Sequence, residues 1–261
     1  MNIDLTGKTA LVGGSSKGLG KAVALQLAEC GANVTLMARN EEKLRKSMTD
    51  LPAGPGQQHG YLVVDYNDFG SFRKITEEWF TCHSVDILVN NTNGPAPGTV
   101  LEKKPEDYQQ AFDLLFQVGC HLSLSALPGM KKKGYGRIIN IASMTVREPI
   151  PHLVLSNSMR SAWVSWSKSL SREVAADGIT VNSILTGYFD TERLNETNAR
   201  SAALNNMSME AWKERMASDI PAKRLGNPAE FGYLTAFLVS DLAAYITGAS
   251  IPIDGGWMKG I

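Results

Sequence analysis

The sequence contains little cysteine and little histidine, and these residues are scattered. Its 261 residues include three cysteines, Cys30, Cys82 and Cys120, which lie far apart, and four histidines. Disulfide frameworks and zinc-type centres require paired or closely spaced ligands, so this spacing argues against both. We therefore expect no metal site, and unpaired thiols fit the reducing cytoplasm.

The sequence also lacks an excess of one charge and a long apolar run. It has 26 Lys+Arg against 26 Asp+Glu, and a pI near 6.9. This balance argues against a nucleic-acid binder and against a polybasic membrane-surface protein. No apolar run approaches the ~20 residues that span a bilayer, and the first residues lack the pattern of a signal peptide. We expect neither nucleic acid nor membrane as a partner.

Short apolar runs alternate with segments of helical periodicity. The expected strands are 9–12, 33–38, 62–65, 86–90, 137–142, 179–184 and 250–254, and the expected helices are 19–28, 41–48, 71–80, 105–132, 156–176 and 228–239. Continuously apolar strands are typical of parallel sheets covered on both faces, and their crossover connections are helical. The pattern predicts an α/β fold, a Rossmann-type doubly wound parallel sheet of about seven strands, in a single domain over 1–261.

Residues 187–221 interrupt this alternation with a polar stretch that is rich in Asn and Met. Long insertions in compact domains are often functional, which favours a substrate lid over the carboxyl ends of the strands. A helical excursion on the surface is the alternative interpretation, and the sequence leaves both open.

A glycine-rich loop follows the first expected strand. It reads Gly13-Gly14-Ser15-Ser16-Lys17-Gly18-Leu19-Gly20 and leads directly into a helix. Glycines at these positions permit a tight turn and close approach of the backbone to a pyrophosphate, while the helix N-terminus favours anions. Since the loop lies between a strand and a helix, it predicts dinucleotide binding rather than a plain turn.

The end of the second expected strand indicates which dinucleotide binds. It reads Met37-Ala38-Arg39-Asn40, without the acidic residue that accepts from the ribose 2′-hydroxyl of NAD. Arg39 and Lys17 are suited to pair with a 2′-phosphate instead. We therefore predict NADP(H) as the cofactor; two solvated surface cations are the alternative.

Seven segments together resemble the short-chain dehydrogenase/reductase family, over essentially the whole chain. They are Gly14-Ser-Ser-Lys-Gly18-Leu-Gly20, Asp65, Leu88-Val-Asn-Asn91, Gly136-Arg-Ile-Ile-Asn-Ile-Ala-Ser143, Ile179-Thr-Val-Asn182, Tyr245-Ile-Thr-Gly248 and Ile253-Asp-Gly-Gly256. The 3-oxoacyl-(acyl carrier protein) reductase-like branch is the most similar. The resemblance implies a Rossmann-fold enzyme that interconverts carbonyls and alcohols with a nicotinamide cofactor and forms a homotetramer or homodimer.

The same resemblance implies the cofactor-binding residues. Asp65 and Tyr66 would lie near the adenine, Asn90 near the ribose, and Gly187, Phe189 and Thr191 near the nicotinamide. The full expected set is Gly14, Ser15, Ser16, Lys17, Gly18, Leu19, Gly20, Arg39, Asp65, Tyr66, Asn90, Asn91, Arg160, Gly187, Phe189 and Thr191.

The catalytic set of the family is Asn, Ser, Tyr and Lys, with the last two spaced Tyr-x-x-x-Lys. In that set a phenol of pKa about 10, lowered by the Lys ammonium, exchanges a proton with the substrate oxygen. Here Ser143 matches the Ser, whereas Ser156 and Arg160 stand at the Tyr and Lys positions, and the Asn position falls near Leu115. The resemblance thus implies a degenerate catalytic set.

Ser156 is a far weaker acid than a phenol, and Arg160 stays protonated. The candidates for the missing proton donor are His152, Tyr188 and a water held by Ser143 and Ser156. Alternatively, His152 is a surface residue and Tyr188 packs the lid. Two functions remain: an NADP(H)-dependent oxidoreductase acting on a small-molecule carbonyl or alcohol, and a non-redox or regulatory NADP(H)-binding protein.

Overall fold

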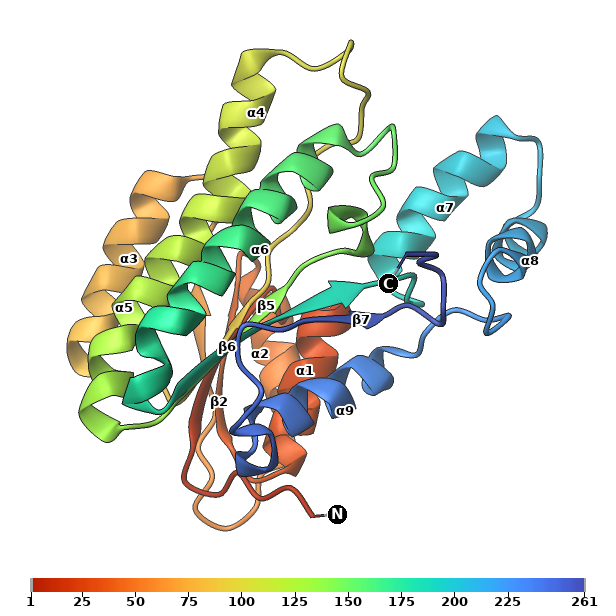
Figure 1. The fold of residues 1–261 in the computed structure, drawn as a ribbon. Helices are drawn as coiled ribbons and strands as arrows, with labels where there is room; N and C mark the ends of the chain where they lie inside the picture. The colour runs from red at the N-terminus through yellow and green to blue at the C-terminus, as the bar shows by residue number, and fades with distance from the viewer. Residues whose placement is uncertain (1, 261) are drawn as a thin grey trace.

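The computed structural model describes residues 2–260 and has a central parallel sheet between two layers of helices (Figure 1). The strands are β1 (Thr9–Gly13), β2 (Asn33–Ala38), β3 (Gly60–Val63), β4 (Ile87–Asn90), β5 (Gly136–Ile141), β6 (Ile179–Thr186) and β7 (Ser250–Ile253). Their order in the sheet is β3-β2-β1-β4-β5-β6-β7, and every pair is parallel. The predicted doubly wound Rossmann sheet is confirmed.

The chain order reverses between β1 and β4, where the crossovers change from one face of the sheet to the other. In open α/β sheets, ligands bind beyond the carboxyl ends of the strands at such a switch point. The strands that flank it are apolar on both faces: Ala10 to Gly13 and all of β4 are buried. The hydrophobic effect therefore fixes the sheet, and the sheet fixes the position of the site.

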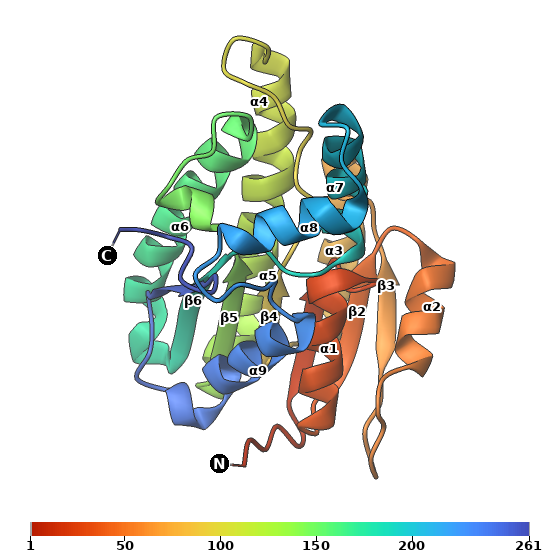
Figure 2. The same ribbon diagram turned by 90° about the vertical axis from the view of Figure 1, so that its right-hand side faces the viewer.

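Two layers of helices cover the sheet. One contains α1 (Gly18–Glu29), α2 (Glu41–Thr49) and α9 (Pro228–Val239); the other contains α3 (Phe69–Cys82), α4 (Pro105–Phe112), α5 (Val118–Lys133) and α6 (Val154–Val174). Helices α1 and α9 pack against each other over one apolar core, and α3, α5 and α6 enclose the second. Figure 2 shows both layers from the side.

Two sequence-based boundaries are wrong. The strand expected at 62–65 is β3, Gly60–Val63, because a turn follows it: the Asp65 carboxylate and carbonyl accept from the amides of Asn67 and Asp68. The helix expected at 105–132 is interrupted at Asp113–Gln117 by a turn of π-helix, which separates α4 from α5. Such wide turns often mark functional positions, and this one contains the buried Leu115.

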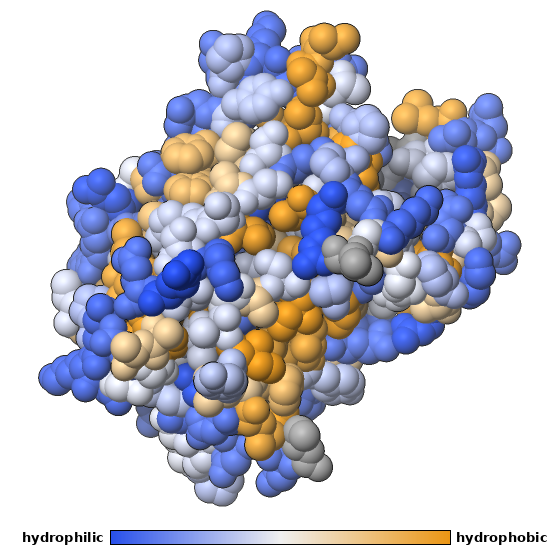
Figure 3. Space-filling view, viewed as in Figure 1, coloured by the Kyte–Doolittle hydropathy of each residue, from blue (hydrophilic) through white to orange (hydrophobic). Residues whose placement is uncertain are grey.

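The insertion forms two further helices, α7 (Glu192–Leu204) and α8 (Met209–Ser218). They lie beyond the carboxyl ends of the central strands, beside the long loop that leads into α4 (Figure 2). In Figure 3, apolar side chains gather at the tip of that loop and at the far end of α7, where Val100, Leu101 and Leu204 are exposed. Between residues 2 and 260, no helix has the length and apolarity needed to cross a membrane.

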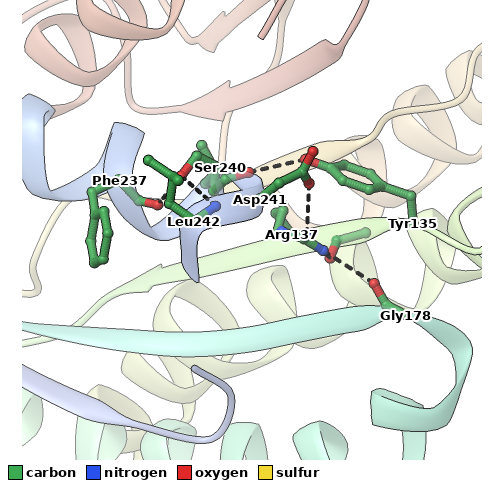
Figure 4. Close-up of polar contacts among 9 residues, drawn as sticks. Tyr135, Arg137, Gly178, Phe237, Ser240, Asp241 and Leu242 are labelled. Carbon is green, nitrogen blue, oxygen red and sulfur yellow. Dashed lines mark hydrogen bonds and ion pairs between the residues drawn. The ribbon is translucent and has the colours of Figure 1, made fainter. Parts of the chain in front are cut away.

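At the opposite end of the sheet, where the strands begin, the buried Arg137 side chain connects several elements (Figure 4). The Arg137 guanidinium donates to the carbonyl of Gly178 at 3.1 Å and pairs with Asp241 at 3.2 Å. It also lies 4.2 Å from the centre of the Tyr135 ring, whose hydroxyl donates to the Val239 carbonyl. These contacts join β5 and β6 to the end of α9, far from the carboxyl edge.

Candidate functional site

The glycine loop turns sharply beneath the start of α1. Gly14 and Gly18 have positive φ values of +55° and +58°, which L side chains rarely adopt. A Cβ on Gly14 would lie 2.7 Å from the Asn91 amide nitrogen, and one on Gly20 would lie 2.8 Å from the Gly13 carbonyl. Only glycine fits at 14 and 20, so these residues shape the loop itself.

Gly18 has room for a Cβ instead. The nearest atoms to a Cβ there belong to Thr191, at 3.7 Å. No side chain of the described residues caps the N-terminus of α1, whereas α2, α3, α7, α8 and α9 are capped by Asn40, Asp68, Thr191, Ser208 and Asn227. Uncapped amides at the positive end of a helix dipole form an anion site. The glycine loop and these α1 amides form a candidate anion-binding cradle beside Thr191.

Two hydroxyls of the predicted set lie beneath the loop. The buried Ser15 hydroxyl donates to the Val12 carbonyl at 2.8 Å and accepts from the Met37 amide at 2.9 Å. The Tyr66 hydroxyl accepts from the Gly14 amide at 3.1 Å and donates to the Met37 carbonyl at 3.2 Å. Burial raises the pKa of Tyr66 well above its usual range. Both side chains therefore hold the loop from below.

The two predicted phosphate-binding cations differ in their surroundings. Arg39 is exposed at the end of β2 and pairs with no carboxylate of the described chain. Lys17 instead lies against α7, 3.3 Å from the Glu192 carboxylate and 3.1 Å from that of Glu196. Partial burial alone would lower the pKa of Lys17. The two glutamates together have the larger effect, so the pKa is raised above its ordinary value.

A buried polar chain lies beyond β4. The Asn90 side-chain amide donates to Asn140 Oδ1 at 2.8 Å and to the Ser123 hydroxyl at 3.0 Å, and Asn140 donates to Ser167. Within residues 2–260, Asn90 Oδ1 has no hydrogen-bond partner although it is buried. An unpaired buried acceptor is costly, and Asn90 is one of the residues that line a cavity. Asn91 donates to the Gly13 carbonyl and so braces the loop.

That cavity lies at the carboxyl ends of β4 and β5, and Arg160 is part of its lining. It is lined by Asn90, Asn91, Thr92, Leu115, Val118, Gly119, Leu122, Ile141, Arg160 and Trp163. Arg160 Nη1 donates to the Ile141 carbonyl at 2.6 Å, and its Nε donates to Ser156 Oγ at 3.2 Å. Burial, with a smaller contribution from the Arg193 charge, lowers the pKa of Arg160 to about 10. The guanidinium is therefore fixed at the cavity and still charged at neutral pH.

The structure does not bring all the predicted catalytic residues together. Ser143 Oγ accepts from the amide and hydroxyl of Thr145, at 3.2 and 3.0 Å. His152 is exposed, and its carbonyl accepts from the Gly98 amide. Tyr188 lines a second cavity, with Arg224, Glu230 and Asp254, and packs on the Trp257 ring. Burial, with a contribution from Asp219, raises the pKa of Tyr188.

Four other residues of the predicted cofactor-binding set make contacts within the protein itself. A Cβ on Gly187 would meet Asp254 Cα at 2.5 Å, so glycine is needed where β6 passes β7. Phe189 is buried against Phe231, and Leu19 packs against the same core. The Ser16 carbonyl accepts from the Ser47 hydroxyl.

One residue of the site was not predicted from the sequence. Arg193, at the start of α7, donates from Nη2 to the Gly94 carbonyl at 3.1 Å and so joins α7 to the loop after β4. Arg193 belongs to no motif, and its position two residues after Thr191 is the one feature of the sequence that could have indicated it. Within residues 2–260, no group of three or more His, Cys, Asp or Glu side chains is arranged to hold a metal ion.

Comparison with known proteins identifies the family. The family model described as enoyl-(acyl carrier protein) reductase matches residues 14–258. The chain is 34% identical over 259 residues to the NADPH-dependent reductase BacG of Bacillus subtilis (strain 168), covering 97% of this chain and 99% of that protein. The chain is a short-chain dehydrogenase/reductase. It is also 33% identical over 253 residues to the 3-oxoacyl-(acyl carrier protein) reductase FabG of Haemophilus influenzae, covering 97% of this chain and 98% of that one.

Solved structures of this reductase family show the same fold. L-sorbose reductase from Gluconobacter frateurii, solved with NADPH and L-sorbose, superposes with a TM-score of 0.94 at 30% identity, covering 100% of both chains. A 3-oxoacyl-(acyl carrier protein) reductase from Agrobacterium tumefaciens, solved with NADP bound, has a TM-score of 0.87 at 28% identity, covering 98% of this chain and 96% of that one.

Proposed function

We propose that this short-chain dehydrogenase/reductase is an NADP(H)-dependent oxidoreductase that acts on a carbonyl or alcohol substrate. The observation that carries the proposal is the cradle at Gly14, Gly18 and the uncapped start of α1, with Arg39 exposed at the end of β2. The absence of an acidic residue at that end of β2 favours the 2′-phosphate of NADP. The relatives described above, which are NADPH-dependent or were solved with NADPH or NADP, support the same choice.

The residues present fit the cofactor in three places. The glycine loop, the α1 amides and Thr191 would hold the pyrophosphate; Arg39 would hold the 2′-phosphate; Asn90 Oδ1 and Arg160 would meet ribose hydroxyls. Asp65, whose carboxylate is exposed to solvent in part, remains a predicted contact of the adenine. When bound, the nicotinamide supplies or accepts a hydride.

Arg160 and Ser156 are the proposed catalytic pair. Because Ser156 Oγ accepts from Arg160 Nε, its own hydrogen is free to donate to a substrate oxygen. The Arg160 guanidinium, held by the Ile141 carbonyl, stabilises the negative charge that develops on that oxygen. An aliphatic hydroxyl and a single water are both poor acids, so we propose that a water held by Ser156 and Ser143 protonates the substrate oxygen and takes a replacement proton from solvent. We favour water over Tyr188, which lines the other cavity.

The first test is hydride transfer. The protein, incubated with NADPH tritiated at the nicotinamide C4 and a panel of aldehydes and ketones, is expected to yield tritiated alcohol. In parallel, Arg39→Ala is expected to weaken NADPH binding about 10- to 100-fold, the contribution of one charge-assisted pair, without changing NADH binding. Absence of tritium transfer from every carbonyl overturns the oxidoreductase, and tighter binding of NADH than NADPH by the unaltered chain overturns the cofactor choice.

The second candidate is a non-redox or regulatory NADP(H)-binding protein. It is favoured by one observation: no tyrosine in the chain is followed by lysine at the fourth position. A Ser156→Tyr, Arg160→Lys double variant separates the two functions. A large gain of carbonyl reduction over an inactive parent supports the binding protein, whereas loss of a measurable parental activity supports repurposed chemistry.

We further propose that residues 187–221 form a lid of the single domain, and that the chain is a cytoplasmic homotetramer or homodimer. Large apolar side chains on α9 and the segment after it support an assembly: Tyr233, Leu242 and Tyr245 are 58%, 53% and 102% exposed. The free Cys30, Cys82 and Cys120 fit a reducing compartment. Light scattering should give two or four times the chain mass of 28.3 kDa, and a monomer mass would contradict the assembly.

A further inference from the structure

The serine that follows β5 accepts two hydrogen bonds from one neighbour. Ser143 precedes a single 3-10 turn, Met144–Val146, and its Oγ accepts from the Thr145 amide at 3.2 Å. The Thr145 hydroxyl donates to the same Oγ at 3.0 Å, and this threonine is only 2% exposed. A serine hydroxyl has two acceptor lone pairs and one hydrogen. Thr145 therefore occupies both lone pairs of Ser143 and leaves its hydrogen.

Burial sets the direction of the bond between these two hydroxyls. If Ser143 donated to Thr145, the Thr145 hydrogen would need another acceptor, and among residues 2–260 the Thr145 hydroxyl has no partner besides Ser143. An unsatisfied hydroxyl in a buried residue is costly. Ser143 is only half-buried, and its hydrogen goes to no acceptor within the same range, so a water or a ligand can take it. Thr145 thus makes Ser143 a donor only.

The same turn lies against the helix that carries the proposed catalytic pair. Residues Met144–Val146 pack on α6, and Arg160 of α6 donates to the carbonyl of Ile141, the last residue of β5. Ser156 Oγ accepts from Arg160 Nε, so Arg160 links the end of β5 to this second hydroxyl. The hydroxyls of Ser143 and Ser156 therefore share two properties: each accepts from a fixed neighbour, and each has a hydrogen that no described residue accepts.

We propose that Thr145 is a positioning residue, which makes Ser143 donate to the oxygen of the water that protonates the substrate. This inference rests on the proposed function, in which Ser156 and Ser143 hold that water. As the O–H bond of the water breaks and the bond to the substrate oxygen forms, hydroxide is left, and the Ser143 hydrogen stabilises its charge until solvent returns a proton. With the hydride of the proposed reaction, this proton converts the carbonyl to an alcohol. A Ser143 that accepted from the water would instead hold back the departing proton.

Neutron diffraction from crystals exchanged into D₂O tests the direction of donation without turnover. The Thr145 deuterium is expected to point to Ser143 Oγ, and the Ser143 deuterium is expected to point to the oxygen of an ordered D₂O molecule. A Ser143 deuterium that points to Thr145 Oγ1 overturns the inference, and so does a Ser143 hydroxyl that contacts no water.

Thr145→Val tests the consequence for catalysis, because it removes the hydroxyl with little change of shape. For a carbonyl that the unaltered protein reduces, kcat should fall about 3- to 10-fold, the contribution of one hydrogen bond, at an unchanged KM. The solvent deuterium isotope effect on kcat should rise, since proton transfer becomes slower relative to the other steps. Thr145→Ser, which keeps a hydroxyl, should restore both values.

Thr235→Val is the matched control, because it removes another buried threonine hydroxyl, one that donates to the Phe231 carbonyl within α9. It should change neither kcat nor the isotope effect. An unchanged kcat in Thr145→Val, or a loss that Thr145→Ser does not restore, overturns the inference. Weakened NADPH binding by Thr145→Val also overturns it, since the hydroxyl then supports the fold of the site. The expected deuterium positions in a protein that transfers no hydride to any carbonyl overturn only the proposed function.

Discussion

At the scale of single residues, the glycine loop could be predicted from the sequence, but the hydrogen bonds that hold it in place could not. Glycine at 14 and 20 follows from backbone geometry, which the order of strand, loop and helix already indicates. The sequence gives no sign that the hydroxyls of Ser15 and Tyr66 lie beneath the loop, because it does not say which face a side chain points to. It likewise does not place Lys17 against Glu192, which is distant along the chain.

Tyr66→Phe tests this support. The variant leaves the Gly14 amide without its acceptor in a buried place, which should lower the free energy of unfolding by about 1–3 kcal/mol. The NADPH Kd should rise as well, because the turn loosens. Urea denaturation and NADPH fluorescence titration measure the two effects. Tyr108→Phe, which removes a hydroxyl from a partly exposed ring on α4, should change neither, and an unaltered Tyr66→Phe would show that the hydroxyl does not stabilise the loop.

At the scale of elements, the alternation of strands and helices could be read because buried parallel strands are continuously apolar. The π-helical turn at Asp113–Gln117 could not, since a wider turn keeps the same apolar spacing on either side. The end of β3 was misplaced because Leu62, Val63 and Val64 are equally apolar, and only the Asp65 turn ends the strand. Residues 187–221 were predicted as a substrate lid or as a helical excursion on the surface, but the contact of α7 with Lys17 could not be predicted from the sequence.

Asp86 joins three elements and gives a pH-dependent stability. Its carboxylate, just before β4, accepts from Thr9 on β1 and pairs with Lys133 of α5 at 2.7 Å. Burial opposes ionisation of Asp86, but Lys133 and the Thr9 donors outweigh it and hold its pKa below the ordinary value. A lowered folded-state pKa gives stability that is complete above the unfolded value of about 3.9 and is lost as the pH falls through the folded-state value.

Asp86→Asn should therefore cost about 1–3 kcal/mol of unfolding free energy at pH 7, and this difference should shrink as the pH is lowered below about 4. Urea denaturation at a series of pH values measures it. Asp219→Asn, at an exposed carboxylate after α8, should follow the unaltered chain at every pH. A difference that stays constant down to the lowest pH would contradict the assignment.

The lid carboxylates should compete with the cofactor for Lys17. Glu192→Gln with Glu196→Gln frees the Lys17 ammonium and removes two negative charges beside the phosphate cradle. The NADPH Kd should fall about two- to tenfold, the range for two exposed ion pairs, and the gain should diminish at high salt. Fluorescence titration measures this, with Glu210→Gln on α8 as the control. An unchanged or raised Kd would contradict competition for Lys17.

At the scale of the whole molecule, the site joins the two halves of the sheet. Strands β3, β2 and β1 lie on one side of the switch point and β4 to β7 on the other, while Thr191, near the end of β6, faces Gly18 across the cradle. A dinucleotide bound there contacts both halves, so its binding should stabilise the domain as one cooperative unit. The order of strands and helices in the sequence predicts this topology, and the topology brings the two halves of the sheet together at the site.

NADPH should accordingly raise the midpoint of a single thermal transition. At 100 times its Kd it adds about 2.7 kcal/mol, which for a domain of this size is a rise of roughly 5–10 °C. NADH at the same concentration should give a smaller rise. Gly18→Ala places a Cβ in the cradle and should abolish the shift, whereas Gly56→Ala carries the same positive-φ strain in an open loop and should keep it. Equal shifts with the two cofactors would contradict the preference for NADP(H), and a full shift in Gly18→Ala would place the dinucleotide elsewhere.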